Sequence, residues 1–353
     1  MGNPIGSRLK IARQRAGLNM RDLGEKAGVS AQAISKYERG INVPGSDVLL
    51  RLSKALDVKV EYFFRTTSIT SFDPVYRKKS RLKFKDERAI TAEIQDWLER
   101  YLEIETLYDL DELYALLKKQ RIANEEDLEE AAIYLRKKWS LGLAPVENLI
   151  EILEMNGIKV GRIKGHSDFD SCTFIMDDAR PVIVVKKDMP GDRQRFSLAH
   201  ELGHLILDLP ESMNSEKAAN RFAGAFLVPK DIVYAELGKK RKSLNPFELH
   251  LLKHKYGLSM QGWIHRAEDL SVIPKTSAKR VFEQFRREGW HLKEPGDQII
   301  PEKPDRMTRL IVRALEENVI SASKASELLG KSLDAFYEHE SKRHGKFPVD
   351  IRN

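Results

Sequence analysis

Hydrophobic residues in the first 64 positions recur every three or four residues, in stretches of no more than about three helical turns. The stretches are separated by Gly17, Gly28, Gly40 and Pro44-Gly45. Glycine and proline at such places end helices, and Asn19 and Ser30 stand where the N-caps of the second and third helices are expected. The pattern predicts a compact bundle of five small helices in residues 1–64.

The next two segments lose and then regain the helical pattern. Residues 65–85 have no sustained periodicity, and we interpret them as a linker. Residues 86–138 predict an acidic helical connector, with an apolar stripe at Ile90, Ile94, Trp97 and Tyr101. Such a stripe needs burial, so we expect the connector to pack against another part of the chain or a partner. The alternative is a charged spacer with its own hairpin core.

Beyond residue 138 the pattern becomes that of a small α+β unit. A helix is expected to open at Pro145 and run through Met155. Residues 158–160, 173–175 and 181–185 are β-like runs, and two further helices are expected at about 193–207 and 215–227. We therefore predict an α+β domain in residues 139–275, followed by a helical C-terminal region in residues 276–353. The predicted fold class is mainly α, with a small α+β core and an N-terminal five-helix bundle.

Charge is distributed unevenly along this pattern. Residues 1–64 carry a net charge of +5, residues 65–85 carry +6, and residues 86–135 carry −10. The basic front end indicates a polyanionic partner. No apolar run approaches the roughly 20 residues of a membrane span, and one cysteine allows no internal disulfide. We expect a cytoplasmic protein with no membrane partner.

The pattern H-E-x-x-H occurs at His200-Glu201-Leu202-Gly203-His204. Residues four apart share one face of a helix, so both imidazoles can bind one Zn²⁺, with Glu201 placed to take a proton from its water. A catalytic zinc takes a third protein ligand, for which we choose Glu216. It lies 12 residues past His204, a loop length that allows a second helix to pack antiparallel to the first. Asp208 and Glu211 are the alternatives.

Residues 19–39 have the layout of a helix-turn-helix, whose second helix enters the major groove of DNA. We expect Gln32 and Lys36 to face base edges, because glutamine pairs with adenine and lysine donates to guanine. Other residues assigned to the DNA-binding surface are Arg21, Arg39 and Ser46, as phosphate contacts, and Ser30.

Two parts of the sequence resemble known families. The stretch LKIARQRAGLNMRDLGEKAGVSAQAISKYERGINVPGSDVLLRLSKALDV, within residues 5–64, resembles the phage-repressor-like (XRE, Cro-type) helix-turn-helix domain. WSLGLAPVENLIEILEMNGIKV, RPVIVV, RQRFSLAHELGHLILD and EKAANRFAGAFLVP, between about residues 139 and 275, resemble the ImmA/IrrE family of metallopeptidases. This second resemblance implies a zincin-like core. It also implies zinc ligands at His200, His204 and Glu216, and a catalytic base at Glu201.

The sequence departs from the second family in one place. Many members have an asparagine after the strand that resembles RPVIVV, where this chain has Lys186-Lys187, so the peptide-binding edge is expected to differ. Members often use a Tyr or His donor for the oxyanion, and Tyr234 and His254 are candidates. Residues 320–330 also look like the first helix of another helix-turn-helix, but residues 331–338 match a DNA-reading helix poorly.

The resemblance implies substrates that are repressors with the same kind of helix-turn-helix domain. We therefore expect a transcriptional regulator that binds double-stranded operator DNA, as a homodimer where the operator is palindromic, and that carries a zinc endopeptidase. One alternative is a regulator whose metallopeptidase fold senses a metal or a partner without cleaving. A further alternative is an antitoxin that binds a toxin and represses its own operon.

Overall fold

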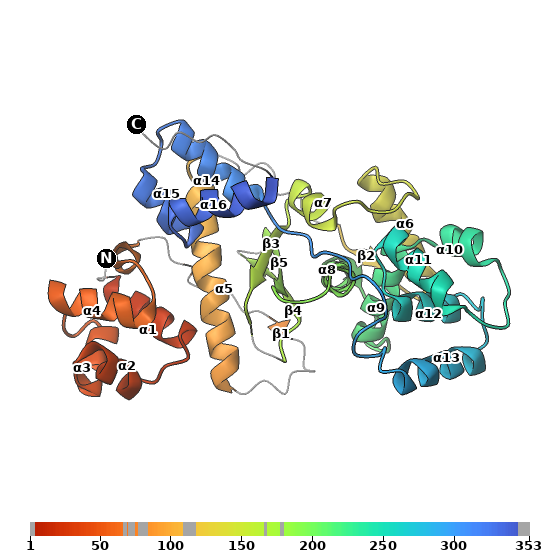
Figure 1. Cartoon of the computed structure of the whole chain (residues 1–353), viewed down its shortest axis with the longest axis horizontal. Coiled ribbons are helices and arrows are strands. Elements are labelled where there is room, and N and C mark those ends of the chain that lie inside the picture. Colours follow the sequence, from red (N-terminus) through yellow and green to blue (C-terminus); the bar gives the residue numbers. More distant parts are fainter. Residues whose placement is uncertain are drawn as a thin grey trace. The chain divides into compact units, whose positions relative to one another are not determined.

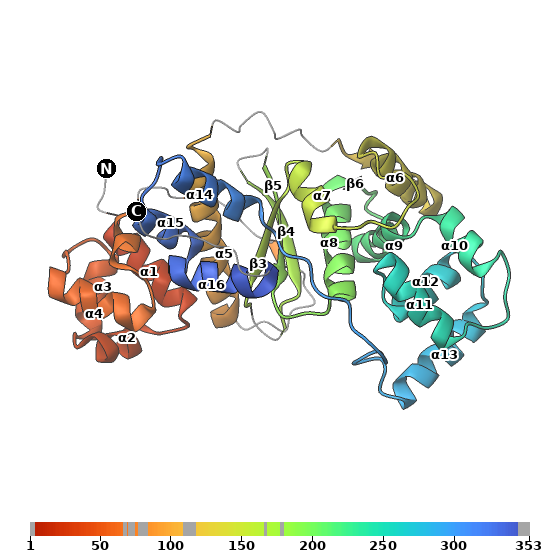
Figure 2. The same ribbon diagram turned by 45° about the horizontal axis from the view of Figure 1, so that its top comes forward.

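Each of the two compact units of this chain is built from segments that are separated in sequence. The computed structural model describes residues 4–65, 69, 75–76, 84–108, 118–165, 168–176 and 180–344. The first unit comprises Met1–Thr70, Arg81–Glu112 and Asp305–Asn353, and the second comprises Ser71–Ser80 and Leu113–Pro304. Figures 1 and 2 show the elements of both units in two views.

The first unit begins with the predicted bundle of short helices (Figure 1). Its elements are α1 (Ile5–Arg15), α2 (Met20–Ala27), α3 (Ala31–Glu38), α4 (Ser46–Leu56) and the 3₁₀-helix η1 (Val60–Phe64). Leu9, Leu23, Ile34 and Leu52 are fully buried in its core. The predicted bundle of short helices in residues 1–64 is therefore confirmed.

The turn between α2 and α3 is specified by local sequence. The Asn19 side chain accepts hydrogen bonds at the start of α2, and Gly28 ends that helix in the left-handed region, with φ of 66°. The Ser30 hydroxyl caps α3. A Cβ on Gly24 would lie 2.6 Å from the carbonyl oxygen of Val29, so a side chain at position 24 would push the turn away from α2.

The rest of the first unit consists of one long helix and a C-terminal group of helices. These are α5 (Phe84–Glu105), α14 (Arg306–Glu316), α15 (Ala322–Leu329) and α16 (Leu333–His344). α5 packs against α1, and its residues Ile90, Ile94 and Tyr101 are buried. Farther along α5, Ile104 packs with Leu328 of α15. The blue C-terminal helices lie beside the orange α5 in both views (Figures 1 and 2).

The predicted connector and the predicted C-terminal region are therefore each divided between the units. Within residues 86–138, α5 belongs to the first unit and α6 (Glu125–Lys138) to the second. Within the predicted C-terminal region, α13 (Lys275–Arg287), which begins one residue before it, falls in the second unit, whereas the last three helices join the first. The apolar stripe of α5 meets the expectation of burial, since Ile90, Ile94 and Tyr101 are all buried.

The second unit contains two small sheets in its described residues. The strands are β1 (Val75–Tyr76), β2 (Gln120–Arg121), β3 (Lys159–Ile163), β4 (Ser171–Met176), β5 (Arg180–Lys186) and β6 (Leu207–Asp208). The larger sheet has the order β1-β4-β5-β3, in which β3 runs parallel to β5, and β4 runs antiparallel to both β5 and β1. In the smaller sheet β2 pairs with β6 in parallel.

Helices pack against the larger sheet and carry most of the core of the second unit. They are α6, α7 (Leu149–Met155), α8 (Gly191–Ile206), α9 (Ser215–Leu227), α10 (Lys230–Leu237), α11 (Pro246–Tyr256), α12 (Met260–Asp269) and α13. α8 packs against β4, β5 and α9, and α9 also packs against α6 and α12. The predicted α+β core is confirmed, because the β-like runs form strands of the larger sheet. The helices expected at about 193–207 and 215–227 are α8 and α9, whose ends lie within two residues of the predicted ones.

Two local expectations differ from the structure. Residues 65–85 were predicted as a linker without regular structure, but Val75 and Tyr76 form β1 at the edge of the sheet; most of the other residues of this segment lie outside the described ones. The helix expected to open at Pro145 begins at Leu149, because Asn148 supplies the N-cap. Among the described helices, none is both long and apolar enough to cross a membrane.

Candidate metal centre and DNA-binding surface

The H-E-x-x-H residues lie in the second half of α8, next to the sheet. His200 and His204 are one helical turn apart, and their Nε2 atoms are 2.9 Å from each other. The side chain of His200 is 1% exposed and that of His204 is 23% exposed. Both imidazoles thus direct their Nε2 atoms to a common point. This point is accessible from solvent on the side of His204.

Glu216 reaches that point from the first turn of α9. Its Oε1 atom is 3.3 Å from Nε2 of His204, and its Oε2 atom is 3.9 Å from Nε2 of His200. In the part of the chain that the structure describes, these three residues are the one group of His, Cys, Asp or Glu whose donor atoms all lie within 4.8 Å of one another. Glu216, which the length of the loop after His204 favoured as the third ligand, is thus the carboxylate that lies next to the two histidines.

Close packing of α8 and α9 brings Glu216 into reach. Gly203, inside the motif, faces α9, and a Cβ built there would lie 3.0 Å from Phe222 and 3.4 Å from the Cα atom of Ala219. A larger residue at this position would push the two helices apart. The glycine therefore sets the distance between the histidines on α8 and the carboxylate on α9.

Asn220 fixes the orientation of His200. Its Oδ1 atom lies 2.7 Å from Nδ1 of His200, so the ring donates its Nδ1–H to the amide oxygen and keeps the lone pair of Nε2 available. We had not predicted this residue from the sequence. The signal was present, because Asn220 lies four residues after Glu216 and therefore on the same face of α9.

Glu201 points from α8 toward the sheet. The hydroxyl of Ser171, at the start of β4, donates a hydrogen bond of 2.7 Å to Oε1 of Glu201, and the Glu201 side chain is buried. Burial raises the pKa of the neighbouring Cys172 thiol, and the Glu201 charge raises it further. Cys172 is thus held neutral. The contribution of Ser171 could not be foreseen, because β4 is separated from α8 in sequence.

The other residues that the sequence nominated for this site lie elsewhere. Asp208 belongs to β6, where it pairs with β2, and Glu211 is exposed in the turn that follows. Tyr234 lies on α10 beneath the ammonium of Lys230, and the ring of His254 packs edge-to-face against that of His250 on α11.

A cavity of about 680 Å³ lies next to residues that contact His200. Phe196 and Asn220 line it, and both contact His200, whose ring lies 6.4 Å from that of Phe196. The opposite wall comes from α12 and includes Gln261 and His265. A cavity of this size can hold one or two side chains of a bound peptide.

The predicted recognition helix presents its polar face to solvent. Ile34 is fully buried and anchors α3 in the bundle, whereas Gln32 and Lys36 are exposed and lie one turn apart on the outer face. This is the arrangement that a helix needs to direct two side chains at base edges in the major groove.

The remaining residues assigned to DNA surround this helix. Ser30 caps α3, and its hydroxyl accepts the N–H of Ala33 at 3.1 Å. Arg21 on α2 forms an exposed ion pair, and Arg39 follows the last residue of α3. Ser46 is exposed at the first position of α4. Arg21, Arg39 and Ser46 are therefore accessible to a phosphate backbone.

The helices α15 and α16 repeat the turn between α2 and α3. Gly330 ends α15 in the left-handed region with φ of 67°, and Ser332, two residues later, caps α16 with a hydrogen bond of 3.1 Å. Gly28 and Ser30 have the same spacing, conformation and cap. The predicted first helix in residues 320–330 is therefore followed by a second helix in helix-turn-helix geometry.

The two recognition positions of this second pair are acidic. Counted from the capping serine, Asp334 and Glu338 occupy the places that Gln32 and Lys36 hold in α3, and both are exposed. Carboxylates at these positions repel a phosphate backbone. The geometry of α15 and α16 thus carries no indication of DNA binding.

The fold and the site together define a class of protein. A small helical domain with a helix-turn-helix precedes an α+β domain in which two histidines and a glutamate from adjacent helices converge. The class is therefore a helix-turn-helix DNA-binding domain joined to a domain of the metallopeptidase type.

Comparison with known families agrees with this class. Residues 9–63 match the family model described as helix-turn-helix. Residues 154–268 match the model described as the IrrE N-terminal-like domain, a peptidase family. The two matches cover separate parts of the chain, and the second includes His200, His204 and Glu216.

Curated relatives match the front domain. A 60-residue stretch is 40% identical to an uncharacterized HTH-type transcriptional regulator of Sinorhizobium medicae, covering 17% of this chain and 43% of that protein. A 58-residue stretch is 40% identical to the HTH-type transcriptional regulator ImmR of Bacillus subtilis, covering 16% and 46%. The chain spans less than half the length of these relatives.

Similarity to solved structures is low. The structure of Bacillus thuringiensis PlcR in complex with the peptide PapR7 and DNA is 12% identical, with a TM-score of 0.18 over 98% of this chain and all of that chain. A score at this level does not show a shared fold.

Proposed function

We propose that this chain is a transcriptional regulator that binds operator DNA through α3 and carries a zinc-dependent endopeptidase in its second unit. The observation that carries the enzymatic part is the meeting of the His200, His204 and Glu216 donor atoms within 4.8 Å, with Glu201 beside them on α8. Two imidazoles and one carboxylate are a donor set of catalytic zinc sites, which leave the fourth position for water or substrate.

The residues present fit this metal in their chemistry. His200 offers Nε2 because Asn220 accepts its Nδ1–H, and His204 and Glu216 complete the set. Bound Zn²⁺ would supply a Lewis acid that polarises a peptide carbonyl and acidifies water.

Glu201 is the proton carrier in this proposal. Its carboxylate takes a proton from the attacking water and delivers it to the leaving amine. The hydrogen bond from Ser171 to Oε1 orients the carboxylate. The cavity lined by Phe196 and Asn220 takes side chains of the substrate next to the scissile bond.

The DNA-binding part rests on the exposed face of α3. Gln32 and Lys36 read base edges, while Arg21, Arg39 and Ser46 bind the phosphate backbone. A palindromic operator requires two copies of this domain, so we propose a homodimer on DNA. The substrate that we propose for the peptidase is a repressor with the same kind of helix-turn-helix domain.

Two measurements on the full chain test this function. Purified protein should hold about one zinc per chain by mass spectrometry, and His204→Ala and Glu216→Ala should lower that value. Glu211→Gln, an exposed carboxylate outside the group, is the matched control. The zinc-loaded chain should then cut one of the helix-turn-helix repressors encoded beside it into discrete fragments. Zinc retained in full by Glu216→Ala, or repressors left intact, would contradict the proposal.

A further inference from the structure

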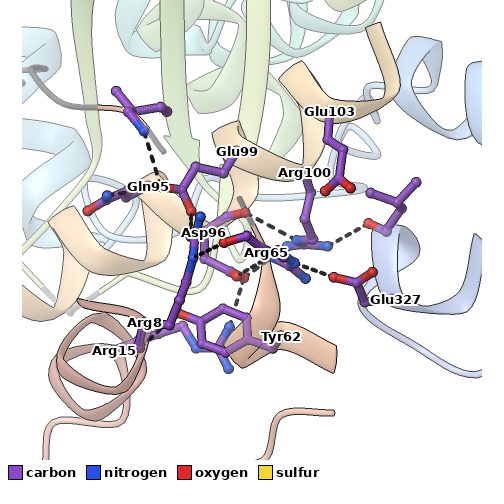
Figure 3. A network of polar contacts seen from close by, with 12 residues as sticks. Arg8, Arg15, Tyr62, Arg65, Gln95, Asp96, Glu99, Arg100, Glu103 and Glu327 are labelled. Carbon is purple, nitrogen blue, oxygen red and sulfur yellow. Dashed lines mark hydrogen bonds and ion pairs between the residues drawn. The ribbon is translucent and has the colours of Figure 1, made fainter. Parts of the chain in front are cut away.

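A second cavity, of about 350 Å³, lies within the first unit. Its walls come from the end of the helix-turn-helix bundle, from α5, and from the turn between α15 and α16. Figure 3 shows the polar side chains that meet beside it, among them Arg15 and Tyr62 from the bundle, Asp96 and Arg100 from α5, and Glu327 from α15. Its volume is in the range of sites for small molecules.

The wall of this cavity carries more positive than negative charge. Among the described residues that line it, five are basic: Arg15, Lys59, Arg65, Arg100 and Lys331. Three lining residues are acidic: Asp57, Asp96 and Glu327. The difference leaves an excess of two positive charges.

One buried carboxylate is shared by three of these arginines. Oδ atoms of Asp96 lie 2.7 Å from Arg15, 3.0 Å from Arg65 and 3.4 Å from Arg100 (Figure 3). Arg65 also pairs with Glu327, which in turn pairs with Lys324 at 2.7 Å. Asp96 and Glu327 carry two negative charges against three guanidinium groups, so the arginines, with one positive charge in excess, repel one another at the floor of the cavity.

Two of the lining cations donate to neutral acceptors. The ammonium of Lys59 donates to the hydroxyl of Ser326 at 2.5 Å, and a guanidinium nitrogen of Arg100 donates to the carbonyl of Leu328 at 2.9 Å. Burial lowers the pKa of Arg100, and the charges of the neighbouring arginines lower it further. An anion in the cavity would relieve this repulsion.

We propose that this cavity binds a small molecule that carries a phosphate or diphosphate group. Such a group matches the excess charge, and several guanidinium and ammonium donors around one anion are the usual means of binding it. Because the walls belong to the helix-turn-helix bundle, to α5 and to α15, the ligand holds these three segments together. This inference does not depend on the peptidase.

Inorganic pyrophosphate is the probe for this site. Its binding to the full chain is measured by titration calorimetry, with the ionic strength kept constant by sodium chloride because salt screens unspecific attraction. Lys59→Gln is the main variant, since Lys59 is exposed and its loss leaves the buried ion pairs intact. Lys331→Gln is the second variant, and Lys54→Gln, an exposed lysine of α4 outside the cavity, is the matched control.

The expected result is saturable binding that Lys59→Gln and Lys331→Gln each weaken about tenfold, while Lys54→Gln leaves it unchanged. Lys36→Gln separates this site from the DNA-binding face and should also leave pyrophosphate binding unchanged. Loss of binding in Lys36→Gln with retention in Lys59→Gln would place the anion on the DNA-binding face and overturn the proposal. Absence of saturable binding to the parent chain would overturn it as well.

Discussion

The two units of this chain use buried polar groups in different ways. In the first unit, charged residues join segments far apart in sequence, and Asp96 meets arginines from α1, from the end of η1 and from its own helix. At the candidate metal centre, the polar groups come from one stretch, residues 171–220, and the two groups that orient His200 and Glu201, the Asn220 amide and the Ser171 hydroxyl, are neutral. The first arrangement holds segments together, whereas the second directs donor atoms to one point. Substitutions in the first should therefore change stability, and substitutions in the second should change chemistry.

The largest effect is expected for Asp96→Asn. Removing this charge leaves Arg15, Arg65 and Arg100 without their shared carboxylate in a buried place, which costs about 3–5 kcal/mol of stability. Hydrogen exchange of α1 and α5 in the full chain should rise steeply, while that of α8 and α9 stays unchanged. Asp47→Asn, which breaks an exposed pair with Arg51, is the control. Unchanged protection in α1 and α5 would show that the shared carboxylate does not hold the unit together.

Acid should weaken the first unit through the same carboxylate. Burial opposes ionisation of Asp96, but the charges of Arg100, Arg15 and Arg65 outweigh it and hold its pKa below the ordinary value. A depressed folded-state pKa means that the stability from this group is complete above an unfolded pKa of about 3.9 and is lost as the pH falls through the folded value. Exchange of α5 should accelerate below about pH 4 in the parent chain, and less so in Asp96→Asn. Equal acid sensitivity of both would contradict this origin.

An intermediate effect is expected on the DNA-binding surface. Lys36→Ala should remove about 1–3 kcal/mol of discrimination at one base position, because Lys36 is exposed where α3 faces the groove. Arg39→Ala should weaken binding to all sequences alike and reduce its salt dependence, as loss of a phosphate contact does. Binding to a set of single-base operator variants at several salt concentrations measures both. Equal losses at every base in Lys36→Ala would move Lys36 to the phosphate contacts.

The smallest of these effects is expected for Asn220→Ala. Loss of the acceptor for the Nδ1–H of His200 should weaken zinc binding about 10- to 100-fold without unfolding α9. Asn220→Asp, which keeps an acceptor, should restore most of the affinity, and Lys217→Ala is an exposed control on the same helix. Competition with a chelator measures the affinities. Equal weakening in Asn220→Asp and Asn220→Ala would mean that Asn220 does not act through this hydrogen bond.

The difference between the units also explains what the sequence could predict. His200, His204 and Glu216 lie on two helices joined by a short loop, so helical spacing and loop length were sufficient to nominate them. Helical spacing could also have predicted Asn220, because it lies one turn after Glu216 on the same face of α9. Ser171 was not, because its approach to Glu201 depends on how β4 packs against α8.

No local sequence pattern predicts the ion pairs between segments that are far apart in the chain. The stripe of Ile90 and Ile94 indicated that α5 would be buried, but not that α5 would pack against α1, α14 and α15. Partners such as Arg65 and Glu327 are separated by 262 residues, and no periodicity relates them.

The turn with the sequence Gly-x-Ser, at Gly28–Ser30 and Gly330–Ser332, shows the opposite limit of prediction from sequence. It joins α2 to α3 and α15 to α16 with the same geometry, while the exposed residues that follow differ in charge.

The central claim, that Glu201 moves a proton during peptide cleavage, is tested most directly by Glu201→Gln. Glutamine has the same shape and can still accept the Ser171 hydrogen bond, but it cannot take a proton from water. The measurement is the rate of repressor cleavage by the zinc-loaded variant, with zinc content and operator binding determined on the same sample. The account predicts that cleavage is abolished while zinc content and DNA binding match the parent chain. Cleavage at the parent rate would contradict it.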